Sequence, residues 1–510
     1  PRMKYLLAHG VGRTGDKTTL FSDDGELVAS ETTEYQTYYL GGNSVEQDPK
    51  EWWDSVCRST KRLLQNIDPN DIAAISFSGQ MMGCVPVDEH GNSIRRALIY
   101  ADQRATDQAD RLIERVGWER MYRITGHRAS ASYSIARLMW LQEKEPETYR
   151  KTHRMLLAKD FIIAKLTGEM ITDYSDASGT NAFDLDSLSW SEEIIEASGV
   201  DRGKFPQAVS STEVVGKVTK EAARQTGLVE GIPVVAGAGD GGCATIGAGS
   251  VELGSPYNYM GSSAWISITS EKPVYDPEMR TFNWAHPIKG WYQPTGTMQT
   301  AGSSFSWLQQ QVCKLETADA QKRKQTPYQL MNDAAEGSPP GANGVVFLPY
   351  LMGERSPWWN PDARGGFLGV GMDTTRADLI RAVIEGVALN LGFSFDAVGA
   401  AGAEAGMTLI GGGARGPLWR QILSDVYGMP LRIPRYLEEA TSLGAAVIGG
   451  VGVGVFSDFG VAPRINSIDH SIEPNRELTE FYEKRRTLLA EHYRAIEPLF
   501  EKRKAYASPG

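Results

Sequence analysis

Apolar runs and glycine-rich turns alternate from the beginning of the chain. An apolar run at 5–8 leads into a glycine-rich stretch at 10–17, β-branched and aromatic residues follow at 18–22, and a turn at 23–25 precedes residues 26–29. β-Branched and aromatic residues favour strands, and short glycine-containing turns join antiparallel neighbours. The pattern predicts strand, glycine turn, strand, tight turn and strand, with no helix after the first turn.

The remainder of the first half alternates helical and strand patterns. Trp52, Trp53, Val56, Leu63 and Leu64 share one face of a predicted helix over 49–67. The other predicted elements of this half are strands at 71–77 and 231–237 and helices near 104–116, 134–144 and 154–166.

The second half repeats the opening theme. Residues 257–260 and 264–268 are predicted strands on either side of a small-residue turn. The later predicted elements are helices at 375–397, 416–427, 440–452 and 475–503 and a strand at 407–410 that leads into three glycines. Two halves that each begin with a hairpin and then alternate strands and helices predict a duplicated α/β fold. We place the two domains at 1–248 and 249–510 and expect the functional site in the cleft between them.

Length and composition narrow the class of protein. The 510 residues exceed one ordinary core, and 41% hydrophobic with 23% charged residues is typical of a globular protein. A net charge of -11 without a basic stripe argues against a nucleic-acid or anionic-membrane partner. The four cysteines form no CxxC pair and indicate neither a zinc site nor a disulfide framework. No apolar run reaches ~18 residues and the N-terminus passes into a strand, so we expect a cytoplasmic protein.

The first glycine-rich turn matches two nucleotide-binding motifs and fits neither. Gly10, Gly12 and Gly15 spell GxGxxG, but a dinucleotide-binding motif requires a helix where a strand is predicted. A P-loop is out of register by one residue, because Asp16 separates Gly15 from Lys17. A glycine turn between strands still presents backbone N–H groups to a phosphate. The turn is a candidate phosphate site, and a nicotinamide oxidoreductase is a distant alternative.

Asp240 is the main candidate for acid–base chemistry. It lies among glycines at 237–242, directly after a predicted buried strand. A carboxylate held there by a rigid element accepts a proton from a substrate hydroxyl or helps to hold Mg²⁺. Asp and Gly also favour turns for conformational reasons alone, and the local pattern leaves the two interpretations equally open.

Further candidate ligand groups lie at other turns and strand ends. The turns at 10–17 and 261–263 would hold the phosphates of one nucleotide from two sides, and glycines 411–413 would lie against adenosine. Gln80, Asp102 and Arg104 supply groups that suit the hydroxyls of a sugar or polyol. Each has a structural alternative, since such glycines occur in ordinary turns and Asp102 with Arg104 is typical of a surface ion pair.

Several segments, in order along nearly the whole chain, resemble the FGGY family of carbohydrate kinases, and most closely its xylulokinase branch. The segments that carry the resemblance are 46–49 with Trp52 and Trp53, 78–81, 102–104, 159–160 with 166–168, 173–180, 239–240, 347–355, 385–388 and 411–415. Some are loose individually, but as an ordered set they are highly specific.

The resemblance implies two actin-like, ribonuclease-H-like domains that close over ATP and a sugar. It implies transfer of the γ-phosphate of ATP, with Mg²⁺, to a hydroxyl of a pentulose such as D-xylulose or of a related ketose or polyol. Asp240 would be the general base and a magnesium ligand. The sugar-binding residues it implies are Gln80, Met81, Met82, Asp102 and Arg104. The nucleotide-binding residues it implies are Gly12, Arg13, Thr14, Lys17, Gly261, Ser262, Gly302, Gly412, Gly413 and Ala414. The sequence leaves the oligomeric state open, with a homodimer as the common default.

This chain departs from the family pattern in three places. In the first turn, Gly10 stands where the family keeps an aspartate that organises magnesium, and Arg13 stands where it keeps a threonine. Met82 replaces the histidine of xylulokinases, and Ser262 replaces a threonine but keeps the hydroxyl. Loss of the carboxylate weakens metal handling, whereas Arg13 offers the phosphates a positive charge. The alternative to an active kinase is a weak or inactive kinase-fold protein that binds sugar and nucleotide.

Overall fold

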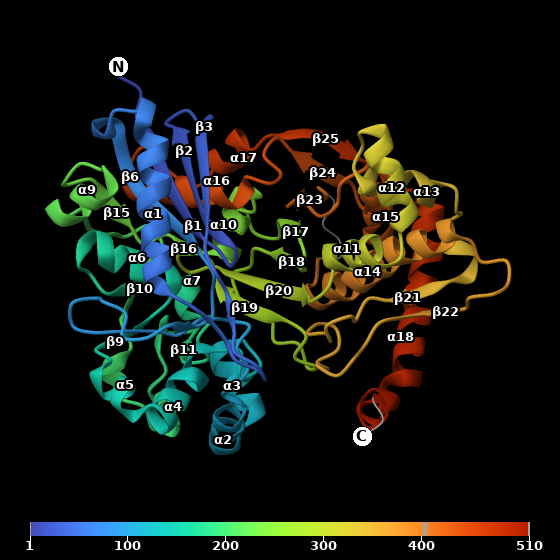
Figure 1. The fold of residues 1–510 in the computed structure, drawn as a ribbon, viewed down its shortest axis with the longest axis horizontal. Coiled ribbons are helices and arrows are strands. Elements are labelled where there is room, and N and C mark those ends of the chain that lie inside the picture. The colour runs from blue at the N-terminus through green and yellow to red at the C-terminus, as the bar shows by residue number, and fades with distance from the viewer. Residues whose placement is uncertain (1, 401–404, 508–510) are drawn as a thin grey trace.

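Two seven-stranded sheets, one in each half of the chain, form the framework of the molecule (Figure 1). The computed structural model describes residues 2–400 and 405–507. The N-terminal sheet has the order β14-β15-β6-β1-β2-β3, and β16 pairs with the end of β6. Its strands are β1 (Tyr5–Val11), β2 (Gly15–Ser22), β3 (Leu27–Glu34), β6 (Ile72–Gly79), β14 (Val214–Lys217), β15 (Pro233–Val235) and β16 (Ala238–Gly239).

The C-terminal sheet repeats this plan in the order β19-β20-β18-β17-β23-β24-β25. Its strands are β17 (Pro256–Met260), β18 (Ala264–Ile268), β19 (Phe282–Ala285), β20 (Tyr292–Met298), β23 (Met407–Ile410), β24 (Leu431–Pro434) and β25 (Ile468–Ile472). In both sheets the first strand of an antiparallel hairpin, β1–β2 or β17–β18, pairs in parallel with a later strand, β6 or β23. The predicted duplicated α/β architecture is confirmed.

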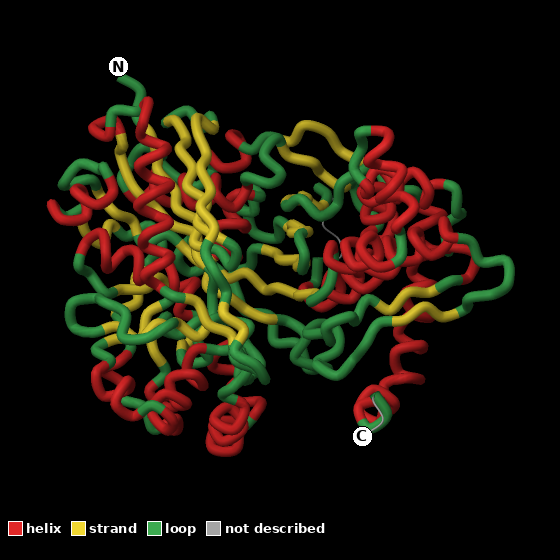
Figure 2. The backbone as a smooth tube through the Cα atoms, viewed as in Figure 1, coloured by secondary structure: helices red, strands yellow, loops and turns green. Residues whose placement is uncertain are grey.

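Helices surround both sheets, as Figure 2 shows in red. Those of the first half are α1 (Pro49–Leu63), α2 (Thr106–Val116), α3 (Trp118–Thr125), α4 (Ser134–Lys144), α5 (Pro146–Lys151), α6 (Ala158–Thr167), α7 (Tyr174–Ala177), α8 (Glu192–Ser198), α9 (Lys220–Thr226) and α10 (Asp240–Gly247). Those of the second half are α11 (Gly302–Gln311), α12 (Lys314–Arg323), α13 (Pro327–Glu336), α14 (Arg376–Val398), α15 (Pro417–Tyr427), α16 (Ala440–Gly452), α17 (Val461–Ile465) and α18 (Arg476–Lys504).

Short strands complete the structure. β4 (Tyr38–Tyr39), β5 (Val45–Gln47) and β8 (Ala97–Leu98) form a three-stranded sheet. The two-stranded pairs are β7 (Val85–Val87) with β9 (Arg154–Leu156), β10 (Ile171–Asp173) with β13 (Gln207–Val209), β11 (Phe183–Asp184) with β12 (Ser189–Trp190), and β21 (Val346–Leu348) with β22 (Gly366–Leu368).

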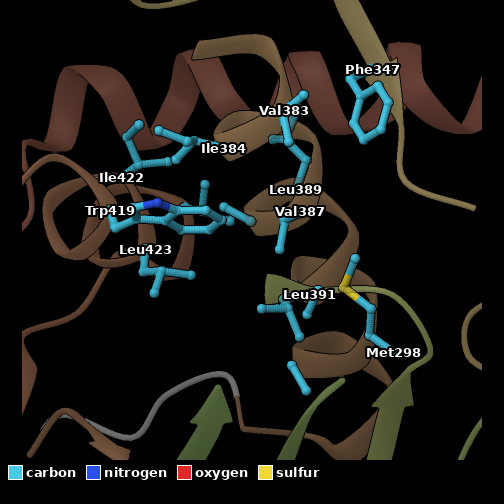
Figure 3. Close-up of a cluster of buried hydrophobic side chains, with 14 of the residues drawn as sticks. Met298, Phe347, Val383, Ile384, Val387, Leu389, Leu391, Trp419, Ile422 and Leu423 are labelled. Carbon is cyan, nitrogen blue, oxygen red and sulfur yellow. The ribbon is translucent and has the colours of Figure 1, made fainter. Parts of the chain in front are cut away.

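Capping residues and apolar faces explain where the long helices begin and what they cover. Asp48 caps α1 by accepting a hydrogen bond from the Lys50 N–H at 3.0 Å, and Pro49 occupies the first helical position. α14 begins with a capping box between Thr375 and Asp378. Figure 3 shows this helix against Trp419 of α15 in the core of the second half. Local sequence thus sets where these helices begin. α1 buries one face, whereas α14 is buried along most of its length and on most sides.

One helix of the second half packs against the first. α16 belongs to the C-terminal part of the chain but contributes apolar side chains to a core shared with β1, β6 and α10. Its backbone approaches α10 so closely that a Cβ on Gly444 would overlap the Cys243 carbonyl oxygen, and a Cβ on Gly247 would overlap that of Ala440. Glycine is therefore required on both sides of this crossing. The division at 248 and 249 stays a prediction.

Two other findings refine the predicted elements. The predicted helix over 154–166 is wrong at its start, because residues 154–156 form β9, paired with β7, and α6 begins only at Ala158. Within the part of the chain that the structure describes, no helix combines the length and apolar character that a bilayer crossing needs.

Candidate active site

Three strands end side by side at one edge of the N-terminal sheet. Gly79 at the end of β6 pairs in parallel with Val11 at the end of β1 and with Gly239 at the end of β16. The segments that continue from these strands are the glycine turn, the loop that starts at Gln80, and α10, which starts at Asp240. Ligands of open α/β sheets bind beyond the carboxyl ends of strands. This edge is therefore the candidate active site.

The glycine turn is a tight link between two strands. β2 begins at Gly15, and the Gly12 N–H donates to the Gly15 carbonyl oxygen at 3.1 Å. Arg13 and Thr14 are exposed at the tip, and Lys17 is half-buried. The dinucleotide-binding interpretation is wrong, because a strand rather than a helix follows the glycines.

The two unusual residues of this turn have different surroundings. A Cβ on Gly10 would lie 3.4 Å from the Lys17 carbonyl oxygen, which is an ordinary contact, so the backbone accommodates a larger residue there. Arg13 donates to the hydroxyls of Tyr39 at 2.6 Å and Tyr100 at 3.4 Å. Its guanidinium thus connects the turn to the loop that contains the predicted sugar-binding residues.

Asp240 is the first residue of α10. Its Oδ1 accepts a hydrogen bond from the Gly241 N–H at 2.8 Å, and the side chain is open to solvent. Although one side is open, protein atoms surround the carboxyl group closely enough that desolvation raises its pKa to about 6. The group is ionised at neutral pH and has a pKa suited to accepting a proton.

One of the two predicted sugar-binding methionines, Met81, lies beside this carboxylate. Met81 packs on Gly239, the residue before Asp240, where a Cβ would meet its sulfur atom. Met82 has a left-handed φ of 70° and lies near Gly179. The structure therefore brings Met81 and Asp240 together, as expected of residues that share one ligand.

Gln80 contacts the glycine turn. Its Nε2 donates to Gln47 Oε1 at 2.8 Å and to the Gly12 carbonyl oxygen at 3.4 Å. Gln47 in turn donates to the Arg13 carbonyl oxygen at 2.6 Å. Gln80 Oε1 is buried and has no hydrogen-bond partner among the described residues. The two amides join the predicted sugar loop to the predicted phosphate turn.

The interpretation of Asp102 and Arg104 as a surface ion pair is wrong. Asp102 is 0% exposed and Arg104 11%, and their side chains lie 2.7 Å apart. Asp102 Oδ2 also accepts from the Val45 N–H at 2.8 Å, and Arg104 reaches Glu46 at 2.8 Å. Glu46 binds Arg95 as well, at 2.7 Å. The pair is part of a buried network that fixes the loop carrying it.

Arg137 is a residue of this site that the sequence patterns did not identify. Its guanidinium is fully buried and donates to the backbone carbonyl oxygens of Met82, Ser132 at 2.7 Å, Tyr100 at 3.0 Å and Asp102 at 2.8 Å. Burial lowers its pKa to about 10, so it stays charged at neutral pH. An arginine among the apolar residues of 134–144 is the sequence signal that points to such a buried role.

The predicted nucleotide-binding residues of the second half also come together. The Gly302 N–H donates to the Gly261 carbonyl oxygen at 2.9 Å, and the Gly413 N–H donates to Met260 at 2.8 Å. Ser262 accepts from the Ala301 N–H at 2.8 Å. A Cβ on Gly302 would lie 2.5 Å from the Gly261 oxygen, so this close approach requires glycine.

An open, polar pocket lies next to these glycines. It has a volume of about 460 Å³ and is lined by Arg415, Arg420, Arg435, Leu437, Glu438 and Glu439. Arg420 donates to the carbonyl oxygen of Ala414, and Glu438 is the nearest group to a Cβ on Gly412. Gly412, Gly413 and Ala414 therefore lie at its edge.

Hydrogen bonds join the start of α10 to the second half. Tyr257 Oη donates to the Gly241 carbonyl oxygen at 3.3 Å, lies 2.8 Å from Thr245 Oγ1, and accepts from Trp265 Nε1 at 3.0 Å. Thr245 also donates to Gln293. The residue next to Asp240 thus contacts β17 of the C-terminal sheet.

Both halves of the chain match one family. Residues 5–247 match the N-terminal domain of the FGGY family of carbohydrate kinases, and residues 257–453 match its C-terminal domain. The chain belongs to this family. It is 31% identical over 507 residues to a xylulose kinase of Staphylococcus epidermidis, covering 98% of this chain and 97% of that protein. It is 29% identical over 495 residues to a gluconokinase of Bacillus licheniformis, and the match covers 97% of this chain and 96% of that protein.

Solved structures agree with the FGGY assignment. Ligand-bound xylulose kinase from Lactobacillus acidophilus has a TM-score of 0.90 and 27% identity, covering 98% of this chain and 99% of that one. Gluconate kinase from the same organism also has a TM-score of 0.90 and 27% sequence identity. The match covers 98% of this chain and 100% of that one. The predicted pair of actin-like domains is confirmed, and the chain is a carbohydrate kinase, a phosphotransferase for which ATP is the co-substrate.

Proposed function

We propose that this FGGY kinase phosphorylates a pentulose such as D-xylulose, or a related ketose or polyol, with Asp240 as the general base. The observation that carries the proposal is the pairing of Gly79 with both Val11 and Gly239. Because of this pairing, the glycine turn, the loop that contains Met81 and the helix that begins at Asp240 all start at one edge of the sheet. The similarity to a xylulose kinase over 98% of the chain supports the substrate class.

The proposed reaction is an in-line phosphoryl transfer. The sugar hydroxyl oxygen attacks the γ-phosphorus, its proton passes to Asp240, a new oxygen–phosphorus bond forms, and the bond to the β,γ-bridging oxygen breaks to release ADP. The backbone N–H groups of Arg13 and Thr14 would donate hydrogen bonds to the phosphates, and the Lys17 ammonium would offset part of their negative charge. Ser262, Gly302 and Gly413 would contact the nucleotide from the second half. Such catalysis depends on positioning and on charge stabilisation rather than on covalent chemistry by the protein.

The residues present also fit one magnesium ion. Asp240 Oδ1 accepts the Gly241 N–H, which leaves Oδ2 for a ligand, and the side chain is open to solvent. Mg²⁺ is commonly held by one or two carboxylates together with substrate phosphates and water. We propose Asp240 as the carboxylate that holds it, where the ion would neutralise charge on the transferred phosphate.

The substrate is tested by ADP release with ATP and Mg²⁺ in the presence of D-xylulose, D-ribulose, glycerol or D-gluconate. We expect the highest kcat/KM with a pentulose. Phosphorylation of D-gluconate without phosphorylation of a ketose would contradict the pentulose assignment and favour the gluconokinase-like alternative. Failure of every acceptor to stimulate ADP release would contradict the catalytic proposal.

Gly10 and Arg13 favour a second candidate, a weak or inactive kinase-fold protein that binds sugar and nucleotide. Without a carboxylate at position 10, Asp240 would hold the metal alone, and one tightly placed ligand fewer weakens a site. Calorimetry distinguishes the two candidates, because the inactive binding protein predicts saturable binding of ATP and of one sugar without turnover.

A further inference from the structure

A fully buried cluster of charged side chains lies behind the strand ends of the active site. Lys159 Nζ of α6 is 2.7 Å from Asp160 Oδ1, 2.8 Å from Asp173 Oδ1 and 3.1 Å from Asp176 Oδ2, and all four side chains are 0% exposed. Burying charged groups costs several kcal/mol per ion before their mutual attraction is counted. Stability alone is a weak reason for such a cluster, because apolar side chains of the same volume often do as well.

A chain of hydrogen bonds leads from this cluster to the residue before Asp240. Asp173 Oδ2 accepts from Ser175 Oγ at 2.5 Å and from the Ser175 N–H at 2.9 Å. Ser175 Oγ in turn accepts from the Gly239 N–H at 3.1 Å. The Ser175 hydroxyl has its proton committed to Asp173, so its lone pair is aimed at the Gly239 amide. The orientation of this backbone group therefore depends on Asp173, and through Asp173 on Lys159.

The same cluster supports the neighbouring strand. A Cβ on Gly79 would lie 3.0 Å from the Lys159 Cβ, so the aliphatic part of Lys159 packs directly on the end of β6. Gly79 precedes Gln80 and Met81. One side chain thus packs under the Met81 loop and anchors, through Asp173 and Ser175, the turn that carries Asp240.

Opposite charges within the cluster favour the protonated form of Lys159. Burial raises the pKa of Asp176 well above its usual value, and also raises that of Asp160. Burial alone would lower the pKa of Lys159, but the three carboxylates hold it well above its usual value. Lys159 therefore stays protonated at neutral pH and keeps its 2.8 Å contact with Asp173 Oδ1.

We propose that Lys159, Asp173 and Ser175 are positioning residues, which fix the Gly239 amide and thereby the direction of the Asp240 carboxylate. The proposal rests on the proposed role of Asp240 as general base. It assigns a purpose to the segments 159–160 and 173–180, which the sugar and nucleotide contacts leave unexplained.

The test compares Ser175→Ala with a matched control. Ser211 Oγ donates to the same Asp173 oxygen at 2.8 Å, but its side chain is not hydrogen-bonded to Gly239. Ser175→Ala is expected to lower kcat about tenfold or more, with the sugar KM within about twofold, because misplacement of a reacting group by about 1 Å costs up to 10² in rate. Ser211→Ala is expected to keep both kcat and the sugar KM within about twofold of wild type.

Amide hydrogen exchange of the peptide that spans Gly239 provides a readout independent of turnover. We expect Ser175→Ala to speed exchange at Gly239 at least tenfold and Ser211→Ala to leave the exchange rate unchanged. Ser175→Cys keeps a weaker acceptor, so its exchange rate should lie between those of wild type and Ser175→Ala. Unchanged exchange in Ser175→Ala would overturn the proposal even if the protein proves catalytically silent. In an active enzyme, faster exchange in Ser175→Ala with unchanged kcat would overturn the positioning role. Equal losses of kcat in Ser175→Ala and Ser211→Ala would also overturn it, because they would show that the cluster only supports the fold.

Discussion

A carboxylate can accept the proton of a sugar hydroxyl only after losing its own. Because burial raises the pKa of Asp240 to about 6 and a bound Mg²⁺ would lower it, we expect kcat to be level above about pH 6 and to fall at lower pH. Well below the pKa, each pH unit should remove about tenfold of the rate. Asp240→Asn should lower kcat by about 10² or more at pH 7 and above, and the difference from wild type should shrink below pH 6. Steady-state rates from about pH 5 to pH 9 check this, and a flat profile or an active asparagine variant would refute the assignment.

Position 10 offers a gain-of-function test. The backbone accommodates a Cβ there at 3.4 Å from its nearest neighbour, so Gly10→Asp should fold normally and add a carboxylate beside the phosphate turn. We expect kcat to rise about tenfold and the Mg²⁺ concentration for half-maximal rate to fall, because a second carboxylate strengthens a metal site that keeps its waters. Gly10→Ala is the matched control, since it adds the Cβ without the charge. Equal rates for the two variants would show that this enzyme does not depend on a carboxylate at position 10.

Single residues differ in how far sequence predicted them. Asp240 and Gln80 could be found because each directly follows a buried strand, and strand ends gather at one sheet edge. Met81 was implied only by the family resemblance. The burial of Asp102 could not, because it depends on Val45 and Glu46, which lie more than fifty residues earlier in the chain. The apolar residues around Arg137 indicate that it is buried. The sequence does not show what it binds, because its partners are backbone carbonyl oxygens, which any residue provides.

Among the elements, the crossing of α10 and α16 makes the clearest prediction about stability. Alanine normally stabilises a helix by about 0.5–1 kcal/mol relative to glycine. Gly444→Ala should instead destabilise the protein by about 1–3 kcal/mol, because its Cβ would overlap the Cys243 carbonyl oxygen and force the helices apart. Denaturant unfolding measures the change. Gly366→Ala is the control, since no heavy atom of the described residues lies within 4 Å of its Cβ; comparable losses in both variants would contradict the explanation.

Helix and strand boundaries were predicted best where a local signal marks them. The small-residue helix at 440–452 and the helix at 416–427 agree with the structure to within a residue because glycine or proline marks their ends. The helix predicted over 154–166 begins too early, because residues 154–156 belong to β9. Their strand pairing comes from β7, about 70 residues earlier, and is therefore invisible in the local sequence.

At the scale of the whole molecule, the repeated hairpins predicted two similar halves, and the family match confirms that plan. What they did not predict is the return of α16 to the first half. Its residues are almost uniformly small and apolar, so their periodicity shows that the helix is buried but does not show against which sheet. α16 packs on α10 because Gly444 and Gly247 let the two backbones approach closely, and this fit depends on both helices together.

The position of α16 also has a consequence for how the protein is made. Residues of β1 and β6 leave the ribosome early, yet the helix that covers them begins at Ala440. At roughly 5–20 residues per second, translation from α10 to the end of α16 takes roughly 10–40 s. For that interval one face of the first sheet lacks its native cover, and the nascent chain depends on transient partners such as chaperones to keep that apolar face from misassociating.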